Sequence, residues 1–511
     1  MHELRPFVRQ YFFDDNDFVN RVAIDWILSS ANGKTGYFSF DTFDSSGKLH
    51  NGEYAMIHSS NPLNADETEP KFPFVWEKRK FPFQMKSYIY RSAMSLWAIG
   101  FEATSAMAAG CADAGAPFNT WEGGFAVQHL PRVKFSKDRK FFKYIELGAL
   151  WKFFYTLAPW KRLQQRLLDF SLSRKIKDGT EDLYMFSEES QVFYTIDREA
   201  DVSVFPKPWE LTDEFGHIIF QIGSGLYWLR KHTEDDTIEF NWDRFQKIAS
   251  FCSAFEIKLA QWAKQSGWIL KAIKNTATVA TIRWVEPWND IISPNRFPFY
   301  EKGKEKDFFE FMQKISEKSW GKPVWCKIVI SDASNIEPIA EQIVATPEIA
   351  PDFITIDGGD WGSGAAPIYL SVLFGKRIYA ALETADKILK KHKVRKNIKI
   401  FAAAKLYTPY MSAKALALWA DAIGNARSIM ISAGCIRAAK CSGEHWACPV
   451  GIATMKKANR RWFRQAWDKK VEQVFNFINA HNKWLIQVAA ISGLKWPQGF
   501  EKKHVVDSDN N

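Results

Sequence analysis

The chain has 511 residues, a formal net charge of +10 at pH 7 and 46% hydrophobic residues, which is enough apolar material for a large core. Its basic residues are scattered and accompany no nucleic-acid-binding motif, so the charge is interpreted as a lysine-rich solvated surface and no nucleic-acid partner is expected. Six cysteines exclude a secreted disulfide scaffold, and there is no signal peptide and no uncharged apolar run long enough to span a bilayer, so we expect a soluble, cytoplasmic protein without a transmembrane segment.

Residues 1–75 are polar and rich in turns, and we expect an N-terminal extension that packs on the rest of the protein. In residues 76–460, short apolar runs alternate with helical patterns, which predicts a parallel sheet. Polar and glycine residues gather where the runs end, as they do around the site of a (β/α)8 TIM barrel, and this is the α/β fold that we predict. Residues 461–511 are expected to form a C-terminal helical tail whose polar end frays. The eight expected strands are residues 87–94, 116–124, 217–222, 255–259, 323–330, 352–357, 398–403 and 420–424.

Residues 136–210 interrupt this alternation with one or two aromatic-rich, basic helices. The simpler interpretation is a helical insertion that packs on the barrel. The alternative is a helix that lies on a membrane surface, because basic amphipathic helices bind anionic lipid.

Residues 351–367, PDFITIDGGDWGSGAAP, form the stretch around which the chain is organised. The pattern predicts a buried strand that ends in a loop where the backbone approaches another group closely. Downstream, residues 416–454 read LALWADAIGNARSIMISAGCIRAAKCSGEHWACPVGIAT. Together the two stretches resemble the flavin-binding part of the glutamate synthase family, whose usual patterns are DGGEGGTGAAP and ALGAD followed by GCIQ, Cys and Cys-Pro-x-Gly-x-Ala-Thr. The resemblance covers about residues 80–455, and the opening HELRPFVRQYFFDD resembles that of single-domain FMN-binding relatives.

The resemblance implies a barrel that binds FMN and an iron–sulfur cluster. Its expected reaction is the reduction of 2-iminoglutarate, formed from 2-oxoglutarate and ammonia, to glutamate, an oxidoreductase reaction on CH–NH2 donors. No cysteine follows Met1 and no G-x-G-x-x-G follows a strand, so a separate glutaminase and an external electron donor are expected, either ferredoxin or an NAD(P)H-oxidising subunit. The alternatives are a flavin-dependent barrel oxidoreductase with another substrate, or an inactive scaffold.

An FMN site needs a flat bed of small groups for the ring, a cation at the N1/C2 edge of the ring, and backbone N–H groups or cations for the phosphate. The resemblance assigns the bed to the end of the first strand, the cation to an apolar strand, and the phosphate to two later loops. In one of these loops this chain has Ala-Ala-Ala-Lys where the family usually has Ala-Ser-Gly, which loses a hydroxyl. The assigned residues are Ser92, Met94, Ser95, Lys327, Asp357, Gly358, Gly359, Ala404, Lys405 and Arg427.

The substrate residues implied by the resemblance lie in the motifs NTWEGG and QWAKQSG. Glu122 suits the substrate nitrogen as a proton donor, and Lys264 suits a carboxylate or the imine, with Gln261 beside it. Lys258 is a second basic candidate. Without the family, the alternative for each is a solvated loop residue.

Three cysteines, Cys435, Cys441 and Cys448, fall within one short window and favour a metal site. They resemble the family's 3Fe–4S ligands, since three thiolates on one loop can bind three irons. The second gap holds six residues where four is usual, so the type of cluster stays open, and His445 is a possible extra ligand. Three unliganded thiols are the alternative. The other cysteines, 111, 252 and 326, are expected to be small core residues.

Tryptophan presents a conflict with the family pattern, because eleven of the 22 tryptophans occupy positions where that pattern has glycine. One such overpacking exchange costs roughly 1–3 kcal/mol, and eleven would exceed a typical total stability of about 5–15 kcal/mol. Our hypothesis is that the codon UGA is read as glycine in the source organism and appears as Trp in this translation. The alternative is a degenerate, inactive relative. The eleven are Trp97, Trp121, Trp228, Trp262, Trp268, Trp284, Trp288, Trp320, Trp325, Trp361 and Trp419.

Overall fold

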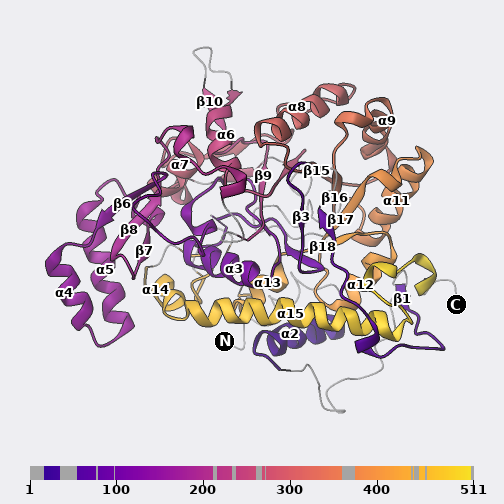
Figure 1. Cartoon of the computed structure of the whole chain (residues 1–511), viewed down its shortest axis with the longest axis horizontal. Coiled ribbons are helices and arrows are strands. Elements are labelled where there is room, and N and C mark those ends of the chain that lie inside the picture. The colour runs from indigo at the N-terminus through magenta and orange to yellow at the C-terminus, as the bar shows by residue number, and fades with distance from the viewer. Residues whose placement is uncertain are drawn as a thin grey trace.

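The computed structural model describes residues 17–34, 54–75, 79–96, 98–210, 216–232, 238–259, 268–270, 272–359, 375–438, 441, 448–454 and 457–507. Eight parallel strands close into a barrel in the order of the sequence (Figure 1). Every one of them overlaps a predicted strand, which confirms the (β/α)8 barrel. The strands are β4 (Ile89–Arg91), β5 (Phe118–Asn119), β9 (Ile218–Ile222), β12 (Ala254–Lys258), β15 (Val324–Val329), β16 (Phe353–Asp357), β17 (Lys399–Ala403) and β18 (Ala422–Asn425).

Helices surround the barrel, and all of them but α13 (Arg427–Ser432), which follows the last strand, connect successive strands. Each connecting helix buries apolar residues at helical spacing, as α11 does with Ile378, Ala381, Leu382 and Ala385. The helices are α3 (Phe101–Asp113), α6 (Trp242–Ala249), α7 (Ala277–Arg283), α8 (Glu305–Lys318), α9 (Glu337–Ala345), α11 (Ile378–Lys391), α12 (Pro409–Ala417) and α13 (Arg427–Ser432).

The barrel interior is filled by side chains, with a polar layer above an apolar one. Glu256 of β12 is 1% exposed and accepts hydrogen bonds from Asn119 Nδ2, Trp325 Nε1 and Thr355 Oγ1 at 2.8–2.9 Å. Below this layer, apolar side chains from the strands pack against residues of a small hairpin, β2 (Phe74–Val75) and β3 (Phe83–Gln84). The hairpin thus closes the amino-terminal end of the barrel and leaves the carboxyl-terminal end for a site.

Residues 136–210 contain a sheet as well as helices. Strands β6 (Phe142–Glu146), β8 (Val192–Ile196) and β7 (Met185–Ser187) form a three-stranded antiparallel sheet, and α4 (Ala149–Leu157) and α5 (Lys161–Lys175) form a projecting hairpin (Figure 1). The two basic helices were predicted. The description of this segment as wholly helical was wrong, because the aromatic residues of 192–196 lie in a fully buried strand.

The two ends of the described chain meet beside the barrel. Helices α14 (Lys457–Gln465) and α15 (Trp467–Ile491) follow the last strand, and α15 packs against α3, α12, α13 and the N-terminal α2 (Asp17–Ala31). Strand β1 (Tyr54–Met56) pairs with β19 (Val505–Asp507). Among the described helices, none combines the length and the apolar character needed to cross a membrane. Two short antiparallel pairs, β10 (Arg230–His232) with β11 (Ile238–Phe240) and β13 (Trp268–Leu270) with β14 (Ile291–Ser293), lie among the barrel loops.

Candidate active site

A buried ion pair joins the ends of β15 and β16. Lys327 Nζ lies 3.1 Å from Asp357 Oδ2, and the two side chains are 3% and 7% exposed. Burial opposes the charge of Lys327, but Asp357 and Glu256 together outweigh it, so the pKa of Lys327 is raised. Burial also raises the pKa of Asp357 to about 6, against the opposing effect of Lys327. Lys327 is therefore a cation at neutral pH, and its partner Asp357 has a pKa only slightly below neutral pH.

A second buried ion pair joins β12 to the loop after β5. Lys258 Nζ lies 3.3 Å from Glu122 Oε1, with side-chain exposures of 11% and 0%. Burial lowers the pKa of Lys258, although Glu122 opposes this effect. A Cβ atom on Gly223 would collide with the Glu122 carboxylate. Glycine after β9 therefore allows this carboxylate to lie over the end of the neighbouring strand.

The two pairs belong to one group of charges. Lys258 and Lys327 are register partners on adjacent parallel strands. Lys327 lowers the pKa of Lys258 and Asp357 raises it. Glu122 in turn raises the pKa of Lys327. Two ammonium groups and two carboxylates thus share the carboxyl-terminal end of the barrel. Such a group can bind an acidic substrate through the lysines and exchange a proton through Glu122.

Arg283 adds a third cation that the sequence analysis missed. It ends α7, is 0% exposed, lies over the Tyr227 ring at 4.7 Å, and interacts electrostatically with Glu122. Burial lowers the pKa of Arg283. The only sequence signal for this residue was an arginine in a largely apolar helix. Arg283 and Glu122 are far apart in the sequence, so the pattern could not show that they lie close together.

The loop after β4 carries the three residues expected to form the flavin bed. Ser92 N donates to Asn425 O at 3.1 Å, and Ser95 Oγ accepts from Ala98 N at 3.3 Å. A Cβ atom on Gly123 would lie 3.0 Å from Ser95 Oγ, so this loop touches the loop of Glu122. Ser92 and Ser95 are buried, and Met94 is half-buried. The structure therefore brings these residues to the same end of the barrel as the ion pairs.

The two loops expected to hold phosphate are neighbours, because β17 and β18 pair directly. Ala404 is buried and Lys405 half-buried just after β17. Arg427 begins α13, and its Nη1 donates to Tyr407 Oη at 3.3 Å. A lysine, an arginine and a phenol thus stand at one edge of the barrel mouth.

The backbone of Gly358 and Gly359 is already occupied. Gly358 N donates to Ala403 O at 3.0 Å and Gly359 N to Lys376 O at 2.7 Å. These glycines consequently shape the end of β16 and do not offer their N–H groups to a ligand.

Asp357 Oδ1 and Asn425 Nδ2 are among the buried polar atoms that have no hydrogen-bond partner within the described residues. Buried polar groups are normally satisfied, so such orphans indicate a missing group. Together with the cations Lys327 and Arg427, they fit a ligand that carries hydrogen-bonding ring edges and a phosphate, as FMN does.

The three clustered cysteines lie near one another at the barrel mouth. Burial raises the pKa of Cys435 to about 11, and Cys441 and Cys448 both influence its ionisation. Among the described residues, only Glu337, Glu341 and His392 place three ligand atoms within 4.8 Å of one another. The three thiols therefore do not stand in the close arrangement that a single tetrahedral ion needs.

Several expected positions lie outside the described residues. These are the substrate candidates Gln261 and Lys264, the possible ligand His445, and Trp97, Trp262 and Trp361.

The backbone bears directly on the tryptophan hypothesis. Within the described residues, ten residues other than glycine have a left-handed φ, and six of them are tryptophans at family-glycine positions. No tryptophan outside the eleven is among these ten. The six are Trp121, Trp228, Trp284, Trp288, Trp320 and Trp419, with φ between 57° and 73°.

Three of these tryptophans, Trp284, Trp320 and Trp419, occupy the position after a helix where glycine often ends it. Trp419 N donates to Leu416 O and the next N–H to Ala415 O, and Trp320 N donates to Glu317 O in the same way. This is the Schellman arrangement, which favours glycine because a Cβ atom is strained in the left-handed region.

Trp325 is crowded for another reason, because its ring centroid lies 3.8 Å from that of Phe353 inside the barrel. Aromatic pairs usually lie about 4.5–7 Å apart.

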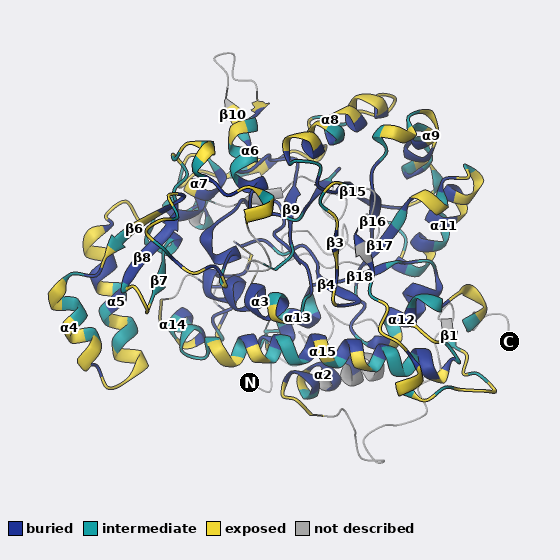
Figure 2. Cartoon of the chain, viewed as in Figure 1, coloured by how far each residue is buried: buried dark blue, intermediate teal, exposed yellow. Residues whose placement is uncertain are grey.

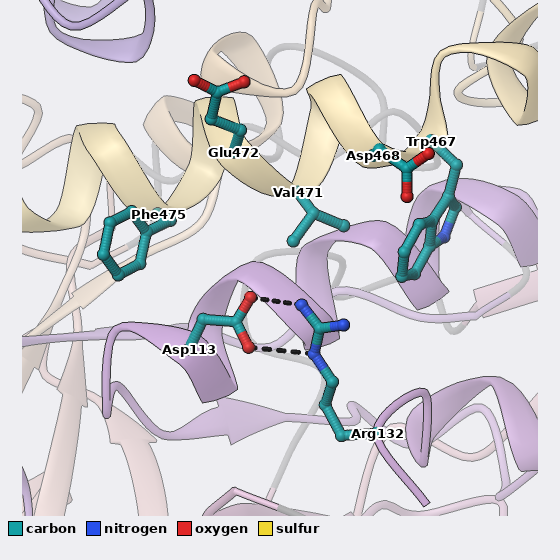
Figure 3. A pocket seen from close by; sticks show the side chains of 7 residues that line it. All are labelled: Asp113, Arg132, Trp467, Asp468, Val471, Glu472 and Phe475. Atoms are coloured by element: carbon teal, nitrogen blue, oxygen red, sulfur yellow. Dashed lines mark hydrogen bonds and ion pairs between the residues drawn. The ribbon is translucent and has the colours of Figure 1, made fainter. Parts of the chain in front are cut away.

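A surface pocket of about 320 Å³ lies away from this site, between α15 and the end of α3 (Figure 3). Two of its polar groups are paired with each other, since Arg132 Nε donates to Asp113 Oδ1 at 2.9 Å and the guanidinium covers the Trp467 ring. It shares no residue with the barrel mouth, so it is not the candidate active site.

The fold and site define a (β/α)8 barrel with a charged group of lysines and carboxylates at the carboxyl ends of its strands. The family profile described as the conserved region in glutamate synthase matches residues 40–495, and the chain belongs to this family. The resemblance seen in the sequence is thereby confirmed.

Curated relatives match over part of their length. The glutamate synthase large subunit-like protein YerD of Bacillus subtilis is 38% identical over 291 residues, which cover 57% of this chain and 53% of that protein. The archaeal glutamate synthase [NADPH] of Methanocaldococcus jannaschii is 32% identical over 242 residues, covering 47% and 43%. The chain thus spans about half the length of these relatives. Among solved structures, the flavin-binding domain of baker's yeast flavocytochrome b2 has a TM-score of 0.43 at 10% identity, covering 99% of this chain and 86% of that one.

Proposed function

We propose that this chain is an FMN- and iron–sulfur-dependent oxidoreductase that reduces 2-iminoglutarate to glutamate. The observation that carries the proposal is the pair of adjacent buried ion pairs, Lys258–Glu122 and Lys327–Asp357, in a member of the glutamate synthase family. External electrons would come from ferredoxin or an NAD(P)H-oxidising subunit, and ammonia from solution or from a separate glutaminase.

Each charged group has a task in this reaction. Reducing an imine needs a hydride at carbon and a proton at nitrogen. FMN supplies the hydride chemistry when bound. Lys258, with Arg283 nearby, can hold the substrate carboxylates, and Glu122 can hold the proton that the nitrogen receives. Lys327, kept cationic by Asp357, can stabilise negative charge at the N1/C2 edge of a flavin ring.

The iron–sulfur cluster would be held by Cys435, Cys441 and Cys448. The support for this part of the proposal is that the three thiols influence one another's ionisation and match the family's cysteine pattern. The cluster would pass electrons from the external donor into the barrel, which is why the proposal includes a partner protein.

Glutamate formation provides the test. The purified chain, under anaerobic conditions with 2-oxoglutarate, an ammonium salt and a chemical reductant, should form glutamate and show a flavin spectrum. The variant K258M should lower this rate by roughly 10²–10³-fold, the usual effect of losing one positioned charge.

The matched control is K322M, because Lys322 is another buried lysine, 4% exposed, that serves the opposite end of the barrel by donating to the carbonyls of Ala249 and Cys252. It should keep the turnover of the folded fraction. A chain that binds flavin but makes no glutamate would contradict the substrate, and equal losses in both variants would contradict the role of Lys258.

A further inference from the structure

Much of the α4–α5 hairpin is exposed (Figure 2). Its exposed residues include a concentrated set of large apolar side chains. Leu150, Phe153, Phe154 and Leu157 follow helical spacing along one face of α4, with exposures of 63%, 59%, 44% and 61%. No residue of α4 is buried. Three more exposed apolar residues continue the surface, at the helix junction and along α5, namely Trp160 (71%), Leu163 and Phe170.

The opposite side of the hairpin is anchored to the protein. Trp151 and Tyr155 of α4 pack against a small core that includes Leu147, Leu168 and Phe193. The hairpin is therefore held in one orientation by its inner side. The exposed apolar residues belong to its outer side and do not take part in this core. Contiguous exposed apolar surface of this kind normally marks an interaction site.

The charge around the stripe is strongly positive. Residues 149–175 contain six lysines and arginines and one carboxylate, Asp169. Arg461 and Arg464 of α14 already hold that carboxylate, each at 2.7 Å. The exposed cations Arg162 and Arg166 lie one helical turn apart on α5.

We propose that the hairpin binds an anionic membrane surface, with α4 lying in the headgroup region and its apolar stripe inserted. Apolar aromatic and leucine side chains on one face, basic side chains beside them, and a tryptophan at the junction are the features that bind such surfaces. Charge complementarity selects an anionic bilayer as the occupant. The proposal is independent of the reaction in the barrel, because the hairpin lies outside the barrel.

Vesicle co-sedimentation with the full chain tests the apolar part. Vesicles of phosphatidylcholine alone are compared with equimolar phosphatidylcholine and phosphatidylglycerol. The chain should bind the anionic vesicles at least tenfold more tightly, and salt should weaken the binding. The variant F153S/L157S should lose more than tenfold in affinity, while V344S/I491S, which changes exposed apolar residues on α9 and α15, should bind like the parent. Circular dichroism verifies that each variant is folded.

A second pair of variants tests the charge. Each cation near an anionic surface strengthens binding about fivefold, so R162Q/R166Q should lose roughly twentyfold. K306Q/K318Q, on the exposed face of α8, should leave the affinity unchanged.

Absence of binding to both vesicles, or unchanged binding by F153S/L157S, would overturn the proposal. So would concentration-dependent self-association of the parent that F153S/L157S abolishes while vesicles have no effect, because the stripe would then be covered by a second copy of the chain.

Discussion

Replacing the six left-handed tryptophans by glycine is expected to stabilise the protein, although each replacement removes an indole. A residue with a Cβ atom pays about 1–2 kcal/mol in the left-handed region. The greater freedom of glycine in the unfolded chain offsets about 0.4–1 kcal/mol of that gain. A net gain of about 0.5–1 kcal/mol per site gives about 3–6 kcal/mol for six separated sites. The six are Trp121, Trp228, Trp284, Trp288, Trp320 and Trp419.

The opposite result is expected if the indoles of Trp121 and Trp228 are well packed, as in a chain that evolved with tryptophan at these positions. Trp121 and Trp228 are 8% and 1% exposed, and truncating a large buried side chain to a small one costs about 3–5 kcal/mol at each site. The loss of about 6–10 kcal/mol would then exceed the backbone gain, and the six-fold variant would be less stable than the parent. The sign of the change in unfolding free energy therefore distinguishes tryptophans introduced by translation from tryptophans that the protein evolved with.

The assay is urea unfolding followed by circular dichroism, on the parent, the six-fold glycine variant and a control with six other changes. The control replaces tryptophans whose backbone is not left-handed, and its midpoint should fall, because glycine there only adds freedom to the unfolded chain and loses packing. A glycine variant that is destabilised like the control would refute the reasoning, as would UGG codons at the six sites. The control positions are Trp151, Trp160, Trp209, Trp242, Trp462 and Trp496.

Three other predictions concern charge and cofactors. Burial raises the pKa of Glu102, but the charges of Arg460 and Arg464 outweigh this effect and lower the pKa to about 2. E102Q should therefore cost about 3 kcal/mol of unfolding free energy at pH 7, and urea unfolding at several pH values should show this difference shrinking as pH falls from about 4.5 towards 2; a constant difference would contradict the linkage. K327A should make the potential of bound flavin more negative while weakening FMN binding less, and an unchanged potential in a spectroelectrochemical titration would remove the assigned role of Lys327. Serine at any of the three clustered cysteines should remove iron, whereas C252S, which changes a buried core thiol, should keep it; iron equal to the parent would exclude that cysteine as a ligand.

The barrel was predictable because its strands leave a local signal. A strand of a parallel barrel is covered on both faces, so residues such as those of β16 read as a continuous apolar run that ends in a polar group, here Asp357. In the sheet of residues 142–196, only the central strand β8 carries such a run. The edge strand β6 is largely exposed and mixes lysine with aromatic residues, a pattern that equally suits a helix.

The sequence predicted which residues form much of the site, but it predicted only part of how they are arranged in space. Motifs placed Glu122 and Lys327 at strand ends, but the partner of Glu122 is Lys258, 136 positions away. Only the closure of the sheet, with β9 between β5 and β12, brings the two together. Arg283 was missed for the same reason, since its relation to the site is set by folding and not by spacing.

Helix α15 holds the two sides of the barrel's seam together, which has a consequence for folding during synthesis. The seam of the barrel is the pairing of the first strand, β4, with the last, β18. Asn482 of α15 accepts hydrogen bonds from Ser87 Oγ and Tyr88 N just before β4, and the neighbouring His481 contacts Ser412 Oγ of α12 at 2.9 Å. The helix thus fastens the two sides of the seam, yet it is translated after every strand of the barrel. At about 5–20 residues per second, the edge of β4 waits unpaired for tens of seconds on the ribosome, a period in which a nascent chain depends on chaperones to avoid aggregation.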